Sequence, residues 1–217
     1  MLKTLSVAAA AAIGLAVSLS AQTTSEPPDT FKVNYYSHAV PEVGPYVAIP
    51  DGTVRITNVG TQIGAPAVGG FPSGSLCAVV LVFAPDQQLA ECCGCIVTPD
   101  GLLTLSINDD LTNNPLTGAT LTTGDIKIVS AGMTCEANNF PPSAGIRAWA
   151  THIQNDLAIT ETPFTDSTLS AGELKLVQNR CAAIFNNGSL FGRCHCPGEG
   201  PDVQGGSSGK KVGFSQP

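Results

Sequence analysis

Cysteine is the residue type whose number and spacing point most directly to chemistry in this chain. Two short blocks, Cys92-Cys93-Gly94-Cys95 and Cys194-His195-Cys196, together offer six soft metal-ligating side chains. Their spacing, however, differs from that of paired cysteines in ordinary zinc sites. An even cysteine count favours a disulfide framework, with a metal site and free reactive thiols as the alternatives. The disulfide candidates are Cys77, Cys92, Cys93, Cys95, Cys135, Cys181, Cys194 and Cys196.

The N-terminal sequence predicts the compartment in which these thiols react. Lys3 precedes an uncharged stretch rich in Ala, Val and Leu, and small residues follow at Ser20 and Ala21. This order is typical of a signal peptide, which we assign to residues 1–21. We therefore expect an exported protein, in the periplasm, on the cell surface or outside the cell, without a membrane span in its mature form. Thiols in such compartments oxidise to disulfides.

Strand geometry predicts part of the disulfide pattern. If residues 76–84 and 87–97 form a hairpin centred near Asp86, Cys77 lies opposite Cys95 and close to disulfide distance. Cys92 and Cys93 are neighbours on the second strand, so their side chains point to opposite faces and need different partners. The remaining pairings stay open. Each disulfide would contribute about 2–4 kcal/mol by restricting the unfolded chain.

Residues that could support acid, base or nucleophilic catalysis form no recognisable motif. The sequence has no G-x-S-x-G, and its 3 histidines are His38, His152 and His195. A strand histidine such as His152 is more often a surface or core residue than a triad base. Glu161 and Asp166 could pair as acid and base, yet nothing in the sequence brings them together. We therefore assign no catalytic residue and no cofactor.

Oxygen-rich and aromatic side chains offer two weaker binding signals. Asp109, Asp110 and Asn113 lie in the densest acidic and amide cluster, which could bind Ca²⁺. The spacing is not that of an EF-hand, and Asp and Asn equally serve turns. Aromatic side chains could form a sugar-stacking platform, although they are core residues by default. The aromatic candidates are Phe31, Tyr35, Tyr36, Tyr46 and Trp149.

Composition restricts the class of protein further. The chain of 217 residues carries 10 basic and 17 acidic side chains, for a net charge of −7. This acidity argues against nucleic acid binding through phosphate neutralisation. Charged residues make up 12% of the chain and apolar residues 43%, a balance that favours a folded core over disorder.

Hydrophobic periodicity predicts mainly β structure. Val54 and Ile56 alternate with polar residues and indicate a half-buried strand, whereas residues 77–83 are apolar on both faces and indicate a central strand. Trp149 is expected to face away from His152. Residues 108–123 indicate a long polar loop. The expected strands are residues 31–36, 53–58, 77–83, 87–97, 103–107, 125–130, 146–153 and 157–162.

One amphipathic helix is expected near residues 171–187. Ser170 and Glu173 have capping-box spacing, and Val177 and Cys181 follow on an apolar stripe. Cys181 could tether the helix to the β body. The predicted fold class is a disulfide-stapled antiparallel β-sandwich with one C-terminal amphipathic helix. The expected organisation is a flexible leader at 22–30, a single β-rich domain at 31–197 and a flexible Gly/Ser-rich tail at 198–217.

The block Glu91-Cys92-Cys93-Gly94-Cys95 is the most specific motif in the sequence. It is followed by Val97-Thr98-Pro99-Asp100-Gly101 and, further on, by residues 160–164 and 169–174. Together these segments resemble a family of uncharacterised secreted acidobacterial proteins, and the resemblance extends over most of residues 51–196. It implies secretion and a shared cysteine framework. It transfers no activity and no catalytic residue.

These observations favour a secreted structural or binding protein without catalytic activity. A carbohydrate-binding module and a secreted hydrolase with an unrecognised site are the alternatives. Self-association and polysaccharide are the partners left open, while nucleic acid is not expected. Exposed aromatics along one sheet face would favour carbohydrate binding. A cleft with a histidine or two carboxylates of shifted pKa would favour an enzyme.

Overall fold

The computed structural model describes residues 28–37, 51–62, 67, 70–112, 121–153, 158–186, 194 and 196. The expected signal peptide, most of the leader and the C-terminal tail lie outside these residues, as do His38, Tyr46, Asn113 and His195. The described elements are β1 (Phe31–Ser37), β2 (Thr53–Asn58), β3 (Leu76–Phe83), β4 (Leu89–Val97), β5 (Leu102–Ser106), a π-helical turn η1 (Ile107–Leu111), β6 (Thr123–Ala131), β7 (Ile146–Ile153), β8 (Ile159–Pro163), β9 (Thr165–Asp166) and α1 (Ala171–Asn186).

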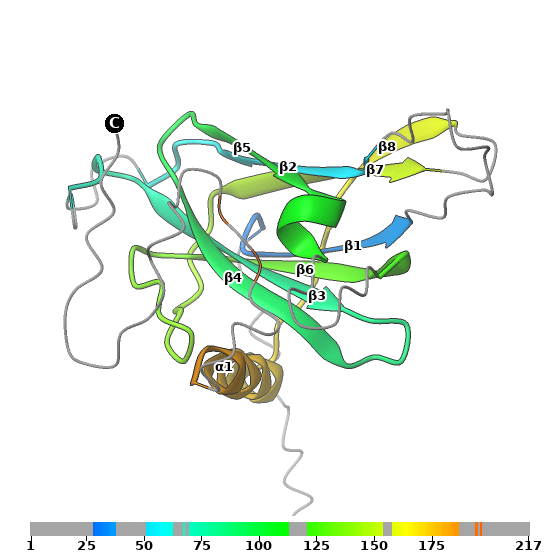
Figure 1. The fold of residues 1–217 in the computed structure, drawn as a ribbon. Coiled ribbons are helices and arrows are strands. Elements are labelled where there is room, and N and C mark those ends of the chain that lie inside the picture. Colours follow the sequence, from blue (N-terminus) through cyan, green and yellow to red (C-terminus); the bar gives the residue numbers. More distant parts are fainter. Residues whose placement is uncertain are drawn as a thin grey trace, which may run out of the picture.

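These strands form two antiparallel sheets. Sheet A has five strands in the order β4-β3-β6-β1-β9, and sheet B has four strands in the order β5-β2-β7-β8. In Figure 1, sheet B lies above sheet A, and α1 lies below sheet A. The predicted fold class, a disulfide-linked antiparallel β-sandwich with one C-terminal helix, is therefore confirmed.

Alternation along the strands divides the core into two clusters. Val80 and Val82 of β3 belong to the cluster between the two sheets. Val79 and Leu81 belong to the cluster between sheet A and α1, called here the cluster under α1. Neighbouring residues on a strand point to opposite faces, so an uninterrupted apolar run supplies both clusters. The prediction that residues 77–83 form a central strand is confirmed.

All eight cysteines lie in the described residues and form four disulfides. The pairs are Cys77–Cys135, Cys92–Cys181, Cys93–Cys194 and Cys95–Cys196. Cys92 lies under α1, and Cys93 lies between the sheets. The prediction that these neighbours take different partners is therefore confirmed. The tether between Cys181 and the β body is confirmed as well.

The predicted pairing of Cys77 with Cys95 is wrong, and a β-bulge explains why. Phe83 pairs with Leu89, which is the register of a hairpin centred on Asp86. One extra residue on β4 then shifts the pairing, so Cys77 lies opposite Ile96 and Cys95 opposite Ala78. A shift of one residue moves a side chain to the other face. Cys77 therefore belongs to the cluster under α1 and Cys95 to the cluster between the sheets.

Most predicted elements have their expected places, with small changes at the ends. The helix ends at Asn186, and the last predicted strand begins at Ile159. Two elements differ from the sequence analysis: η1 lies partly within the expected polar loop, and β9 has only two residues. In the described residues, no helix combines the length and apolarity that a bilayer crossing requires.

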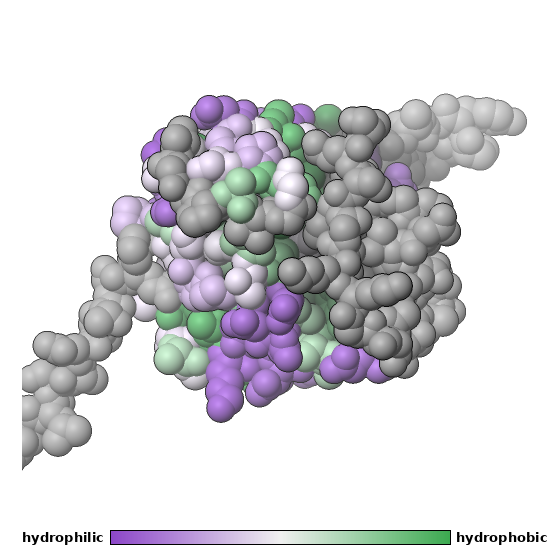
Figure 2. Space-filling view, turned by 90° about the vertical axis from the view of Figure 1, so that its left-hand side faces the viewer, coloured by the Kyte–Doolittle hydropathy of each residue, from purple (hydrophilic) through white to green (hydrophobic). Residues whose placement is uncertain are grey.

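The face presented in Figure 2 has no single dominant apolar patch among its described residues. Hydrophilic side chains gather low on this face, at the level of α1 in Figure 1, and hydrophobic side chains form small groups above them.

Gly94 lies where the disulfides crowd β4 most closely, so it tests the described packing. A Cβ at this position would collide with Sγ of Cys135 and lie 3.1 Å from Sγ of Cys77. We expect Gly94→Ala to lower the free energy of unfolding by about 1–3 kcal/mol, because a disulfide cannot move aside as a free side chain can. Gly132→Ala is the matched control, since a Cβ there meets no atom within 4 Å. Equal denaturant midpoints for the two variants would contradict this packing.

Candidate functional site

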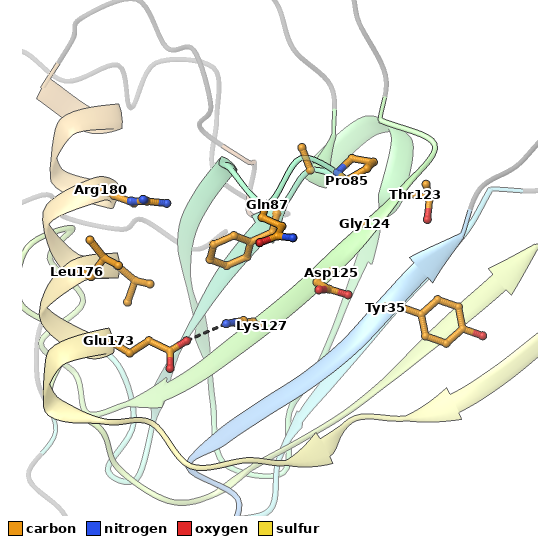
Figure 3. Close-up of a pocket in the computed structure, with 13 residues that line it drawn as sticks. Tyr35, Pro85, Gln87, Thr123, Gly124, Asp125, Lys127, Glu173, Leu176 and Arg180 are labelled. Carbon is orange, nitrogen blue, oxygen red and sulfur yellow. Dashed lines mark hydrogen bonds and ion pairs between the residues drawn. The ribbon is translucent and has the colours of Figure 1, made fainter.

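A groove of about 710 Å³ lies on the outer face of sheet A, beside α1. Its walls come from β1, the β3–β4 turn, the start of β6 and α1. Figure 3 shows Leu176, Glu173 and Arg180 on the helix, facing Lys127 and Gln87 across the groove. The residues that line it therefore come from segments far apart in the sequence.

The helical wall of the groove begins at a side-chain cap. The Glu173 backbone N–H donates to Oγ of Ser170 at 3.1 Å, as the capping-box spacing predicts. The Glu173 carboxylate pairs with Lys127 instead of turning back to the cap. Val177 and Cys181 are the buried helical residues, and the disulfide from Cys181 to Cys92 holds this face against β4. Part of the groove is thus covalently fixed.

Charged groups of both signs line the groove. Nζ of Lys127 lies 2.7 Å from Oε1 of Glu173, so β6 and α1 are joined by an ion pair. The same ammonium lies 5.0 Å from the centre of the Phe83 ring, a cation–π contact. Within the described part of the chain, neither Arg180 nor Asp125 forms an ion pair, so a guanidinium and a carboxylate are available to a ligand.

One end of the groove is marked by Tyr35, which is 47% exposed. Its ring stacks on His152 with 4.1 Å between the ring centres. His152 is fully buried, and its Nε2 lies 2.7 Å from Oγ1 of Thr162. Burial lowers the pKa of His152, which favours the neutral imidazole. His152 therefore supports Tyr35 and does not reach the groove surface.

A buried acid and a buried phenol lie inside the sandwich, near the other side of β6. Tyr36 and Glu91 are both buried, and neither Oη of Tyr36 nor Oε2 of Glu91 has a hydrogen-bond partner in the described structure. The Tyr36 ring crosses over Gly124, where a Cβ would lie 2.8 Å from Cε1. Burial raises the pKa of Glu91 to about 8. Burial, with Glu91 and Asp125 nearby, also raises the pKa of Tyr36.

The calcium candidates lie in a hydrogen-bonded turn. Ser106 caps η1, since the Asp109 backbone N–H donates to its Oγ at 2.8 Å. The Asp110 carboxylate accepts the Ser106 backbone N–H at 2.7 Å, and Asp51 accepts the Ser106 hydroxyl. The carboxylates of Asp110 and Asp51 therefore stabilise the turn through hydrogen bonds to Ser106. With Asn113 outside the described residues, a calcium site here stays a prediction.

The other candidates are separated by the fold. Glu161 pairs with Arg55 on the outer face of sheet B, and Asp166 pairs with Lys32 in sheet A. Burial opposes ionisation of Asp166, but the hydrogen bond from Lys32 keeps its pKa below the ordinary value. The two acids thus pair with different cations, and Lys32 is shared with Asp29.

The aromatic candidates do not share one surface. Phe31 and Tyr36 are buried in different core clusters, and Tyr35 borders the groove. Trp149 lines a separate, shallow pocket of about 390 Å³ together with Lys32 and Arg147. The four described aromatics of the expected platform are therefore not aligned on one sheet face, and Tyr46 lies outside the described residues.

Sequence analysis did not identify the polar residues of the groove. Lys127 and Asp125 lie on a strand that was expected only for its apolar alternation, and Arg180 lies on a helix expected for its apolar stripe. In the sequence, Glu91 belongs to the cysteine block and to no other pattern. Its position two residues before Cys93 was the available signal, because alternation places both on the buried face.

Comparison with known proteins adds no assignment. No family model matches the chain, and no curated protein matches it. A solved structure described as Thermotoga maritima 1070 superposes with a TM-score of 0.38 and 12% sequence identity, over 65% of this chain and 97% of that chain. A similarity of this size carries no argument about fold or function.

The raised pKa of Glu91 predicts a pH dependence of stability. Its ordinary pKa is 4.5, so between about 4.5 and 8 the folded chain holds a proton that the unfolded chain has released. Stability contributed by the buried neutral acid is complete below this window and is lost as the pH rises through it, by up to about 1.4 kcal/mol per pH unit. We expect Glu91→Gln, which stays neutral, to lack this slope in denaturant unfolding. Parallel pH profiles for the two proteins would show that Glu91 is ionised in the fold.

Proposed function

We propose that this chain is an exported, non-catalytic binding protein whose ligand occupies the groove beside α1. Export is supported by the signal-peptide pattern at residues 1–21 and by four disulfides, which are typical of oxidising compartments. Membership in the secreted family that the Glu-Cys-Cys-x-Cys block resembles is part of the same proposal.

The groove is the main observation that supports a binding role. Its volume of about 710 Å³ falls within the range of small-molecule sites. The disulfide Cys92–Cys181 and the ion pair Lys127–Glu173 hold its helical wall in place. Binding therefore costs little ordering of the protein, since the site is largely formed beforehand.

The side chains of the groove favour a saccharide ligand. Sugars have an apolar ring face and many hydroxyl groups that both donate and accept hydrogen bonds. Phe83 and Tyr35 offer apolar surface, Gln87 and Arg180 offer donors, and Asp125 offers an acceptor. A polysaccharide partner at the cell surface would present such units repeatedly.

A binding role is favoured over hydrolysis by the position of the groups with shifted pKa values. Glu91 and His152 are both buried, and neither lines the groove. Catalytic acids and bases must reach the substrate within hydrogen-bond distance.

Filling the groove tests this proposal. Leu176 is 49% exposed within the groove, and a larger side chain there would occupy the space of the ligand. We expect Leu176→Trp to weaken the binding of any saccharide found in a calorimetric screen of neutral and uronic-acid oligosaccharides by about tenfold or more.

Leu102→Trp is the matched control, because Leu102 is 65% exposed on β5 in the other sheet. It should leave the affinity unchanged. A screen without any binder would contradict the saccharide proposal. A binder whose affinity Leu176→Trp does not alter would place the site elsewhere.

A further inference from the structure

Four of the eight cysteines form two neighbouring disulfides, here named the C-x-C cluster: Cys93, Cys95, Cys194 and Cys196. We propose that the C-x-C cluster binds one zinc-class cation when both of its disulfides are reduced. The cluster would then be a redox-dependent metal site, closed by disulfides when oxidised.

The positions of the sulfur atoms carry this proposal. The Sγ atoms of Cys93, Cys95 and Cys196 all lie within 4.8 Å of one another, and Cys93 is bonded to Cys194. In a tetrahedral site with Zn–S bonds of about 2.3 Å, the sulfurs lie about 3.8 Å apart. Opening the two S–S bonds therefore lets Cys93, Cys95 and Cys196 reach these separations by side-chain movements of roughly 1–2 Å, and Cys194, next to Cys93, would supply the fourth sulfur.

Strand geometry explains why four sulfurs meet at this place. Cys93 and Cys95 are two residues apart on β4, so both side chains point to the same face. Both disulfides span the same sequence separation of 101 residues, so Cys194 and Cys196 lie beside β4 in register with Cys93 and Cys95. The two disulfides are therefore neighbours, and three of their sulfurs lie within 4.8 Å of one another.

The other two disulfides do not share this arrangement. Cys77, Cys92 and Cys181 belong to the cluster under α1, with Cys135 packed against it, on the opposite face of sheet A. Within the part of the chain that the structure describes, the C-x-C cluster contains the one group of three or more Cys, His, Asp or Glu ligand atoms this close together. The fold therefore divides the cysteines into two sets of four. Among the described residues, only the C-x-C cluster brings three sulfurs within 4.8 Å of one another.

Burial favours a metal over free thiolates in the reduced cluster. An apolar environment raises the pKa of a thiol, so four separate buried thiolates would be costly, and a cation offsets that cost. Cys194 and Cys196 are each 7% exposed, compared with 1% for Cys95. The side of the cluster at Cys194 and Cys196 is therefore where a reductant and a metal ion would approach.

A dithiol supplies the electrons and protons that reduce the two disulfides of the C-x-C cluster. Each equivalent of dithiol transfers two electrons and two protons to one S–S bond, giving two cysteine thiols and one oxidised, disulfide-containing reductant molecule. Two equivalents yield the four thiols of the C-x-C cluster. A divalent cation then replaces four protons and forms four metal–sulfur bonds.

Metal loading of the full mature chain tests the proposal. The chain is reduced with a dithiol under native conditions, freed of reductant without oxygen, and mixed with Zn²⁺ or, as a spectroscopic probe, Cd²⁺. We expect one ion per chain by native mass spectrometry and a thiolate-to-cadmium charge-transfer absorbance, with no ion bound to the oxidised chain. A reduced chain that binds no ion would overturn the proposal.

Two variants with equal numbers of cysteines assign the ion to its ligands. In one, Cys93, Cys95, Cys194 and Cys196 are all replaced by Ser; in the other, Cys77, Cys92, Cys135 and Cys181 are replaced. We expect loss of the ion in the first and retention in the second, with folding followed by circular dichroism. Retention by the first variant would overturn the proposal. Should the second not fold, Cys95→Ser/Cys196→Ser in the otherwise native chain must still lose the tetrahedral cadmium signal.

Discussion

Strand β4 lies at the edge of sheet A and carries cysteines on both of its faces, and three of the four disulfides begin there. Cys92 reaches α1 on one face, while Cys93 and Cys95 reach residues near the C-terminus on the other. Alternation along a strand makes this division unavoidable, since neighbouring side chains point in opposite directions. An edge strand has a strand partner on one side only. Three disulfides connect β4 to α1 and to Cys194 and Cys196.

The groove depends on one of these disulfides. A helix of 16 residues is marginally stable alone, and α1 buries only Val177 and Cys181 fully. Leu174, Ile184 and Phe185 pack partly buried against the same cluster, and the disulfide from Cys181 to Cys92 fixes the position of α1 on sheet A. The groove and the C-x-C cluster lie on opposite faces of sheet A, so the sheet separates the proposed ligand site from the proposed metal site.

Much of the fold could be predicted because the signals are local. The alternation of Val54 with Ile56 and the cap at Ser170 depend on near neighbours, and both predictions are confirmed. The candidate site was less accessible to prediction. Lys127 and Arg180 are far apart in the sequence, and neither is unusual on its own element. Glu91 is unusual only once the strand is known to be buried on that side.

Periodicity within single elements was enough to predict the class of fold, the separate partners of Cys92 and Cys93, and the tether through Cys181. The pairing of the cysteines depends on strand register, which becomes visible only in the folded chain. The β-bulge on β4 shifts the strand register by one residue, so Cys95 lies opposite Ala78 and not opposite Cys77. Hydrophobic periodicity does not indicate a bulge. The groove and the C-x-C cluster likewise become visible only in the folded chain, since each is assembled from segments that only chain folding brings together.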